Sequence, residues 1–162
     1  MCRRKLKKTI YIETSIISYL VGGATRDLLI AARQEMTKEW FESYAGKYSL
    51  FISSLVYQEI SKGNALAVEK RLDAVKSAKV LELTNEANEL ARALIEMSVI
   101  PRTSVGDSLH IAVSAVSGMD FLVSWNFKHI SGASIRLKIA EAIETYGYVS
   151  PVICTPEELL EE

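Results

Sequence analysis

Short apolar runs alternate along the chain with longer segments in which apolar residues recur at helical spacing. The short runs are rich in β-branched and aromatic residues, and they predict strands at 9–12, 48–52, 80–83 and 121–123. The longer segments predict helices at 14–20, 25–45, 85–97, 104–117 and 135–146, with two more between 53 and 78 that Gly63 separates. This alternation is typical of α/β folds with a mostly parallel sheet.

The length and composition of the chain favour a single folded domain. Its 162 residues are enough to bury one core, and 49% apolar with 24% charged residues is ordinary for a globular protein. We expect one domain over 1–162, with its core at about 8–150. A capping-box sequence at Thr155–Glu158 predicts a short tail helix at about 156–161.

Charge and cysteine usage limit the classes of partner and compartment. The formal net charge is −1, whereas a protein that binds nucleic acid through bulk electrostatics is usually basic, so any nucleic-acid site must be local. Cys2 and Cys154 lie near opposite ends without CxxC spacing, which fits the reducing cytoplasm. No apolar run approaches the roughly 20 residues that a membrane helix needs, so we expect no membrane partner.

Two polar residues come directly after predicted strands. Glu13 follows the first strand, and Asn126 lies just beyond the strand at 121–123. In open parallel sheets the carboxyl ends of the strands line the ligand crevice, so both side chains are candidates for a site there. Polar residues at strand ends are also common in ordinary loops, so neither position identifies a site by itself.

A third candidate, Glu59, lies on a helix where a core would not place a carboxylate. Helical geometry projects it between Leu55 and Val56, inside the apolar arc of its own helix. Two interpretations remain open. Either Glu59 reaches water from the margin of that arc, or it faces a cationic partner or a metal ion.

The fourth candidate, Asp107, begins a helix that is apolar around most of its circumference. The segment Ser104–Asp107 matches a capping box, which would make Asp107 a helix-capping residue. Asp107 also shares one narrow polar stripe with His110 and Ser114, and such a stripe predicts a wet cleft or another polar group. His110 alone is more typical of a hydrogen-bonded core histidine.

These segments resemble, in order, the four motifs of PIN domains. An apolar strand ends in an acid followed by Thr or Ser, a second acid lies on the helix after the second strand, a third begins an alanine-rich buried helix, and the fourth position follows a strand ending in Thr or Ser. The matching segments are Ile10–Ser15, Ser53–Ile60, Asp107–Ala112 and Leu122–Phe127. The order is matched from residue 9 to about 130, and in size the chain is similar to the VapC-type toxins.

The resemblance implies a three-layer α/β/α fold around a mostly parallel sheet of about four or five strands. It implies a metal-dependent endoribonuclease, the toxin of a type II toxin–antitoxin pair, that hydrolyses RNA phosphodiesters to leave 5′-phosphate and 3′-hydroxyl ends. The implied partners are RNA, a cognate antitoxin protein whose tail occupies the acidic cleft, and a second copy of the chain. The expected homodimer buries apolar surface from the amino-terminal half.

Carried over residue by residue, the resemblance implies a catalytic set made of Glu13, Glu59, Asp107 and Asn126. Glu13, Glu59 and Asp107 would be ligands of Mg²⁺ or Mn²⁺, which are hard cations that prefer oxygen. Asn126 would be an auxiliary ligand or would position a water molecule. The residues expected to support the ligands are Thr14, Ser15 and Ser124.

Two positions depart from the family pattern, because Glu13 and Asn126 stand where PIN domains usually have aspartate. The first change keeps the charge and lengthens the side chain, whereas the second keeps an oxygen and removes a charge. One alternative is therefore a catalytically weakened PIN domain that binds RNA or a protein partner without cleavage.

Two other α/β classes fit the sequence less well. A phosphotransferase with a strand-end nucleophile would need a second aspartate two residues after the first acid, and Ser15 stands there. A nucleotide-binding Rossmann protein would need a glycine-rich loop after the first strand, and Gly22–Gly23 does not match that motif.

Overall fold

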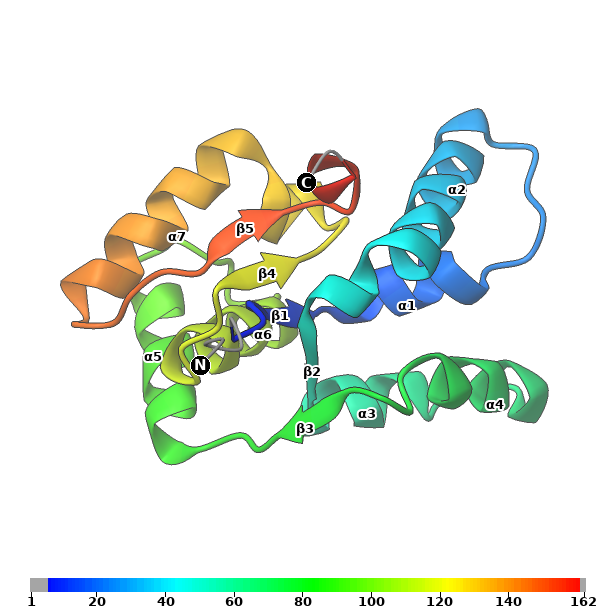
Figure 1. The fold of residues 1–162 in the computed structure, drawn as a ribbon. Coiled ribbons are helices and arrows are strands. Elements are labelled where there is room, and N and C mark those ends of the chain that lie inside the picture. Colours follow the sequence, from blue (N-terminus) through cyan, green and yellow to red (C-terminus); the bar gives the residue numbers. More distant parts are fainter. Residues whose placement is uncertain (1–5, 161–162) are drawn as a thin grey trace.

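The computed structural model describes residues 6–160, so Cys2 and the last residue of the expected tail helix lie outside the described part. Five strands form one parallel sheet in the order β3-β2-β1-β4-β5 (Figure 1). The strands are β1 (Thr9–Ile12), β2 (Ser49–Ser53), β3 (Lys79–Leu81), β4 (Phe121–Val123) and β5 (Val152–Cys154). The predicted α/β fold with a parallel sheet is confirmed.

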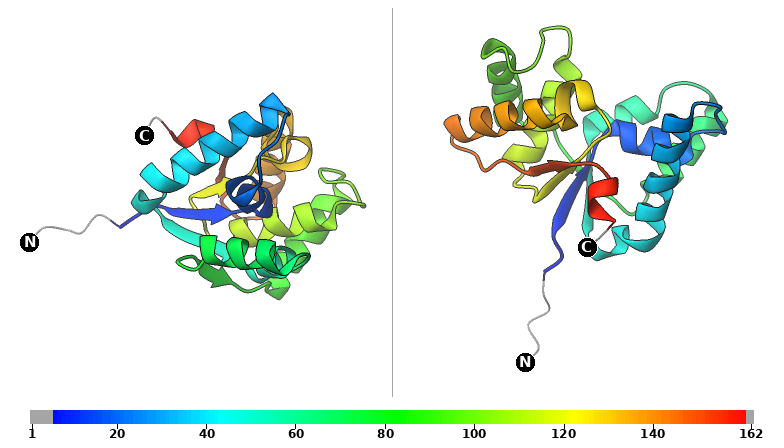
Figure 2. Two further views of the ribbon diagram at one scale, coloured as in Figure 1. Left: turned by 90° about the vertical axis from the view of Figure 1, so that its right-hand side faces the viewer. Right: turned by 90° about the horizontal axis from the view of Figure 1, so that it is seen from above.

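Helices cover both faces of this sheet. They are α1 (Thr14–Val21), α2 (Leu28–Ser43), α3 (Ser54–Ile60), α4 (Ala65–Ala74), α5 (Asn85–Glu96), α6 (Val105–Val116) and α7 (Ala133–Thr145), with shorter turns η1 (Ala45–Lys47), η2 (Phe127–Ser131) and η3 (Glu157–Leu159). Figures 1 and 2 show α5, α6 and α7 gathered on one side of the strands and α1 to α4 on the other. The arrangement is the expected three-layer α/β/α fold. Within residues 6–160, no helix is long and apolar enough to cross a bilayer.

Most element boundaries follow local signals in the sequence. Gly63 separates α3 from α4 and has a φ of 104°, a left-handed conformation that glycine adopts at no steric cost. The helix predicted at 25–45 begins later, because the Asp27 side chain accepts hydrogen bonds from the first backbone amides of α2. The strand β5 was not among the predicted strands; it has three residues and follows Pro151. The expected tail helix is reduced to the 3-10 turn η3.

The central strand β1 lies in the middle of the core, and Glu13, the first candidate acid, follows its last residue. Ile10, Tyr11 and Ile12 are fully buried between the helix layers. Helix α6 is buried against the sheet as its apolar circumference predicts. Because β1 pairs with β2 on one side and β4 on the other, the residues that follow these three strands meet at one edge of the sheet.

The amino end of β1 is held by Asp120, the residue that precedes β4. Its carboxylate accepts hydrogen bonds from the Thr9 amide at 2.8 Å and hydroxyl at 3.0 Å, and it forms an ion pair with Lys8 at 2.9 Å. The Thr9 hydroxyl oxygen accepts from the Asp120 amide at 2.9 Å. Led by the Thr9 amide, these donors hold the pKa of Asp120 below its ordinary value.

We expect Asp120→Asn to lower the free energy of unfolding by about 1 kcal/mol at pH 7, because neutral asparagine is a weaker acceptor for these donors. A carboxylate whose pKa is depressed in the folded state stabilises the protein above its unfolded pKa of about 3.9, and this contribution is lost as the pH falls. The difference between the parent and the variant, measured by urea unfolding, should be constant from about pH 8 to about pH 5 and shrink below about pH 4. A difference that does not change with pH would show that the Asp120 charge adds nothing.

Candidate metal and nucleic-acid site

The Glu13 carboxylate lies at the carboxyl end of β1 and is only 6% exposed. Its Oε2 accepts hydrogen bonds from the hydroxyls of Ser15 and, at 2.8 Å, Ser124. Ser15 Oγ in turn accepts from the Trp125 amide at 2.9 Å, and Ser124 Oγ accepts from the Asn126 amide at 3.0 Å. Glu13 therefore connects the start of α1 to the segment after β4. Ser15 and Ser124 contact it as expected.

A second group of hydrogen bonds converges on Glu59, which α3 carries. Its Oε2 accepts from the Thr14 hydroxyl and lies 3.1 Å from His110 Nε2. His110 is 2% exposed, and its Nδ1 lies 2.8 Å from the Tyr11 hydroxyl, which is 2.7 Å from Ser53 Oγ. Glu59 therefore has polar partners from α1 and α6, and His110 connects it to Tyr11 of β1. His110 is the buried, hydrogen-bonded histidine that its position predicted, and its partner is a candidate ligand.

The donors in this group all point toward Glu59. A carboxylate only accepts, so His110 Nε2–H donates to it, and in a neutral ring Nδ1 then accepts from Tyr11. The Tyr11 oxygen accepts from the Ser53 hydroxyl, and Ser53 Oγ accepts from the Val56 amide at 3.2 Å. Burial raises the pKa of Tyr11 well above its ordinary value, which keeps the phenol a donor. In this series of hydrogen bonds, the buried polar side-chain atoms of Ser53, Tyr11 and His110 therefore all have partners.

The Glu59 carboxylate is held in its charged form. Burial of this group raises its pKa, but the hydrogen bond from His110, with contributions from Thr14 and Lys62, outweighs that effect and holds the pKa below its ordinary value. Glu59 therefore offers a carboxylate at neutral pH although it is half-buried. Its Oε1 lies near Gly106, where an added Cβ would be 3.7 Å away.

Asp107 does not complete the capping box that its sequence predicted. The Ser104 side chain makes no capping hydrogen bond and lies 3.2 Å from His129 Nδ1. Asp107 Oδ2 accepts from the same His129 nitrogen at 2.7 Å, and Oδ1 accepts from Asn126 Nδ2 at 3.0 Å. Asp107 therefore faces the segment after β4. The polar stripe reaches the site through Asp107 and His110, whereas Ser114 bonds to its own helix and is fully buried.

The orientation of the Asn126 amide is fixed by its two partners. Its Oδ1 accepts from the His129 amide at 3.1 Å while its Nδ2 donates to Asp107. A flipped amide would place a donor against a donor at His129 and an acceptor against an acceptor at Asp107. Asn126 therefore acts as a donor toward the third acid and as the cap of η2. Gly132 closes this turn, because a Cβ there would overlap the Phe127 carbonyl oxygen.

The oxygen-rich donor set fits a hard cation, but the carboxylates do not meet in one group. Among residues 6–160, no three His, Cys, Asp or Glu side chains gather closely enough to hold a metal ion as they stand. Each of the three acids instead accepts hydrogen bonds from its own hydroxyl, imidazole or amide donors. In the described part of the chain, Oε1 of each glutamate accepts no hydrogen bond, which leaves one oxygen of each for a ligand. The expected metal ligands thus stay a prediction.

Two residues of the site were not found by sequence reasoning. His129 stands three residues after Asn126, and Tyr11 lies inside a strand that reads as core. The signal for His129 was its short spacing from a strand-end asparagine, because the Asn126 side chain can accept a hydrogen bond from the backbone amide three residues later. Tyr11 has no local signal, because its polar partners Ser53 and His110 come from distant segments.

Residues 10–133 match the sequence model of the PIN domain family. The match spans most of the 162 residues, and the chain belongs to this family. No protein among the curated sequences matches the chain.

Solved structures share the fold at low sequence identity. VapBC2 from Rickettsia felis, bound to a DNA fragment from its promoter, aligns with a TM-score of 0.58 and 14% identity over 91% of this chain and 98% of that one. VapC20 from Mycobacterium tuberculosis, a sarcin-ricin loop cleaving toxin, aligns with a TM-score of 0.53 and 16% identity, and the alignment covers 87% of this chain and 97% of that one. DNA-bound VapBC from Salmonella typhimurium aligns with a TM-score of 0.53 and 15% identity, and the alignment covers 92% of this chain and 98% of that one. At these identities the likeness establishes the fold.

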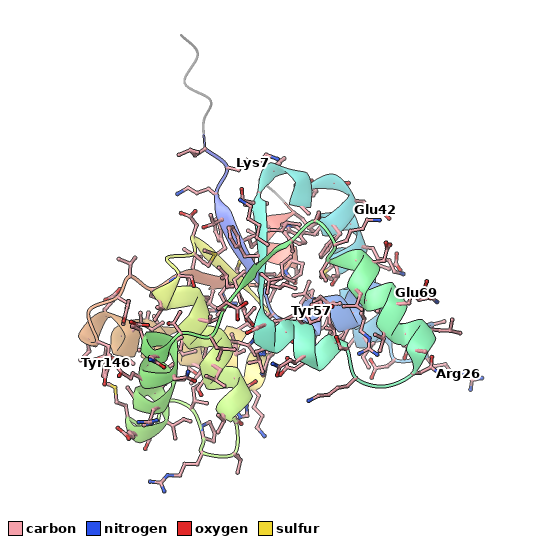
Figure 3. The ribbon with its side chains drawn as sticks, turned by 90° about the horizontal axis from the view of Figure 1, so that it is seen from below. Lys7, Arg26, Glu42, Tyr57, Glu69 and Tyr146 are labelled. Carbon is pink, nitrogen blue, oxygen red and sulfur yellow. The ribbon has the colours of Figure 1, made fainter. Side chains whose placement is uncertain are left out.

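We predict that Tyr11→Phe destabilises the protein by about 2 kcal/mol, because it leaves the buried Ser53 hydroxyl proton without an acceptor and His110 Nδ1 without a donor. The measurement is urea unfolding at pH 7. Tyr57→Phe is the matched control, since Tyr57 lies at the surface of α3 and is 49% exposed (Figure 3). It should change stability by less than about 0.5 kcal/mol. Equal effects of the two changes would contradict the directed chain of donors.

Proposed function

We propose that the protein is a metal-dependent endoribonuclease that hydrolyses RNA phosphodiesters at the edge of the sheet where Glu13, Glu59, Asp107 and Asn126 lie. The observation that carries the proposal is the buried Glu13 carboxylate. It has hydroxyl donors but, among residues 6–160, no cationic side chain within ion-pair distance. Burying an ionised carboxylate without a cation is costly, so this position favours a bound cation.

The residues proposed to hold Mg²⁺ or Mn²⁺ are Glu13, Glu59 and Asp107. When bound, such an ion supplies an activated hydroxide and stabilises the leaving oxygen of the phosphodiester. The chain's own contribution is to place these carboxylates on three different elements and to fix their rotamers. Thr14 and His110 hold Glu59, Ser15 and Ser124 hold Glu13, and Asn126 with His129 holds Asp107. A positive ion would also offset the repulsion between these acids and a polyanion, which a net charge of −1 otherwise leaves uncompensated.

We also propose the role of a toxin in a type II toxin–antitoxin pair, with a cognate antitoxin as protein partner and a cytoplasmic location. Membership of the PIN family and the likeness to VapC and VapBC structures support this role. A homodimer through the amino-terminal half stays a prediction. The strongly exposed Leu28, Leu29 and Leu66 on α2 and α4 are apolar surface that such a dimer could bury.

One observation favours the alternative of a PIN domain that binds RNA or a protein without cleaving it. Asn126 presents its amide donor to Asp107, so the fourth position satisfies the third acid in place of a cation. The two functions differ in metal affinity. Titration calorimetry with Mn²⁺ and Mg²⁺ separates them, because the alternative requires no metal binding at all.

Asp107→Asn should reduce RNA cleavage in Mn²⁺ by at least about 100-fold, since it removes one charge from the proposed ligand set. Cleavage of a labelled RNA is followed on denaturing gels, and circular dichroism checks the fold. Asp73→Asn on the exposed face of α4 is the matched control and should cleave like the parent. If Asp107→Asn cleaves as fast as the parent, the metal-site proposal is wrong.

We expect Asn126→Asp to destabilise the metal-free protein and to increase the stabilisation that added metal gives. Without metal it places a carboxylate oxygen against Asp107 Oδ1, where the amide nitrogen now lies at 3.0 Å, so the melting temperature should fall by about 2–4 °C. Added Mn²⁺ should raise the melting temperature of Asn126→Asp more than that of the parent, because the extra charge strengthens binding to the folded state.

The matched control for this charge change is Asn88→Asp on α5, whose side chain bonds to its own helix start. Its metal-induced shift should equal that of the parent. An equal shift for Asn126→Asp as well would mean that position 126 does not face the metal.

A further inference from the structure

A cation and two aromatic rings lie beside the acidic residues and have no part in holding them. Trp125 and Phe127 flank Asn126 in the sequence, and their ring centroids are 6.1 Å apart. The Arg33 guanidinium, from α2, lies 5.5 Å from the Trp125 ring and 4.9 Å from the Phe127 ring. The segment that carries Asn126 into the site therefore also carries an arginine–aromatic cluster, made of Arg33, Trp125 and Phe127.

The position of Arg33 is fixed by the packing of α2 against the end of β4. The Trp125 indole N–H donates to Thr37 Oγ1 at 2.8 Å, and the Thr37 hydroxyl donates to the Arg33 carbonyl at 2.6 Å. The Trp125 amide is held by Ser15, which also contacts Glu13. The arginine–aromatic cluster thus shares its supports with the first candidate acid, so its distance from the site is set by the fold.

Arg33 keeps its charge uncompensated. Within residues 6–160 no carboxylate lies within ion-pair distance of its guanidinium, and its side chain makes one long hydrogen bond, 3.4 Å to the Tyr19 hydroxyl. Aromatic rings occupy the flat faces of a guanidinium and leave the N–H donors in its plane for an anion. A planar fork of donors with no acid partner is suited to the oxygens of a phosphate.

Phe127 is 42% exposed although it is a large apolar side chain next to a polar site. Trp125, by contrast, is buried and serves as packing. An aromatic ring that packs against Trp125 and Arg33 and is partly open to solvent is a platform on which a nucleobase can stack, and stacking of this kind tolerates any base sequence. The exposed ring and the uncompensated charge are therefore complementary to the two parts of a nucleotide.

We propose that Arg33 and Phe127 form a nucleotide-binding subsite for single-stranded RNA, in which Arg33 binds a backbone phosphate and the Phe127 ring stacks on a base. This inference rests on the proposed function, since it names how the same site grips its substrate. The net charge of the chain is −1, so RNA binding requires a local cationic contact, and Arg33 supplies one in this subsite.

The test is fluorescence anisotropy with a fluorescein-labelled single-stranded RNA of about 10 nucleotides, in the Asp107→Asn background so that the probe is not consumed. Arg33→Gln and Phe127→Leu should each weaken binding about tenfold. Arg33→Gln should also reduce the salt dependence of binding by about one phosphate contact, whereas Phe127→Leu should leave the salt dependence unchanged. Arg33→Lys, which keeps the charge but loses the planar fork, should fall between the background and Arg33→Gln.

The matched control is Arg92→Gln on α5, an exposed arginine on the other side of the sheet from α2 (Figure 1). It should change the affinity less than about twofold, and thermal melts should show all variants folded. Unchanged affinity in both Arg33→Gln and Phe127→Leu, or absence of RNA binding in the background, overturns the subsite. So does a loss of self-association in light scattering with RNA affinity intact, which would assign the cluster to a protein contact. A parent that binds RNA through these residues but never cleaves it would overturn the nuclease and leave the subsite standing.

Discussion

The buried carboxylate of Glu13 is the constraint around which the rest of the site is arranged. An ionised group at the end of the central strand must be surrounded by donors, and the chain supplies hydroxyls from Ser15 and Ser124. The same hydroxyl oxygens accept the amides of Trp125 and Asn126, so satisfying one charge also sets the path of the chain after β4. That path places Asn126 and His129 against Asp107, and it also places the Trp125 and Phe127 rings beside Asn126.

Each of the other acids has a separate support. Glu59 is held by a chain of donors that begins at the cap of α3 and passes through Tyr11 and His110. Asp107 is held by an amide and an imidazole from the segment after β4. These supports come from different elements, so the three acids are oriented independently of one another. Sequence spacing proposed these acids as candidates but could not show how far they converge, because the donors that hold them come from distant segments.

The sequence predicted the features that depend on short-range pattern. Four of the five strands (β1 to β4), the buried helix α6 and the break at Gly63 follow from hydrophobic period and backbone sterics. The capping box at Ser104 failed because tertiary contact with His129 outcompetes a local hydrogen bond. Strand β5 was missed because it forms through pairing with β4, a tertiary contact that no local pattern records. The role of Tyr11 depends on partners about 40 and 100 positions away, which no local pattern records.

The order of the strands has a consequence for when the candidate site can assemble during synthesis. The central strand β1 is made first, but its second neighbour β4 starts at residue 121, and the side chains that complete the site follow it. A chain emerging from the ribosome therefore carries Glu13 and Glu59 long before Ser124, Asn126 and His129 exist to organise them. Pairing over such a separation is slow, because loop closure must precede the contacts that repay it. The candidate site can therefore assemble only after residue 129 has been synthesised and β4 has paired with β1.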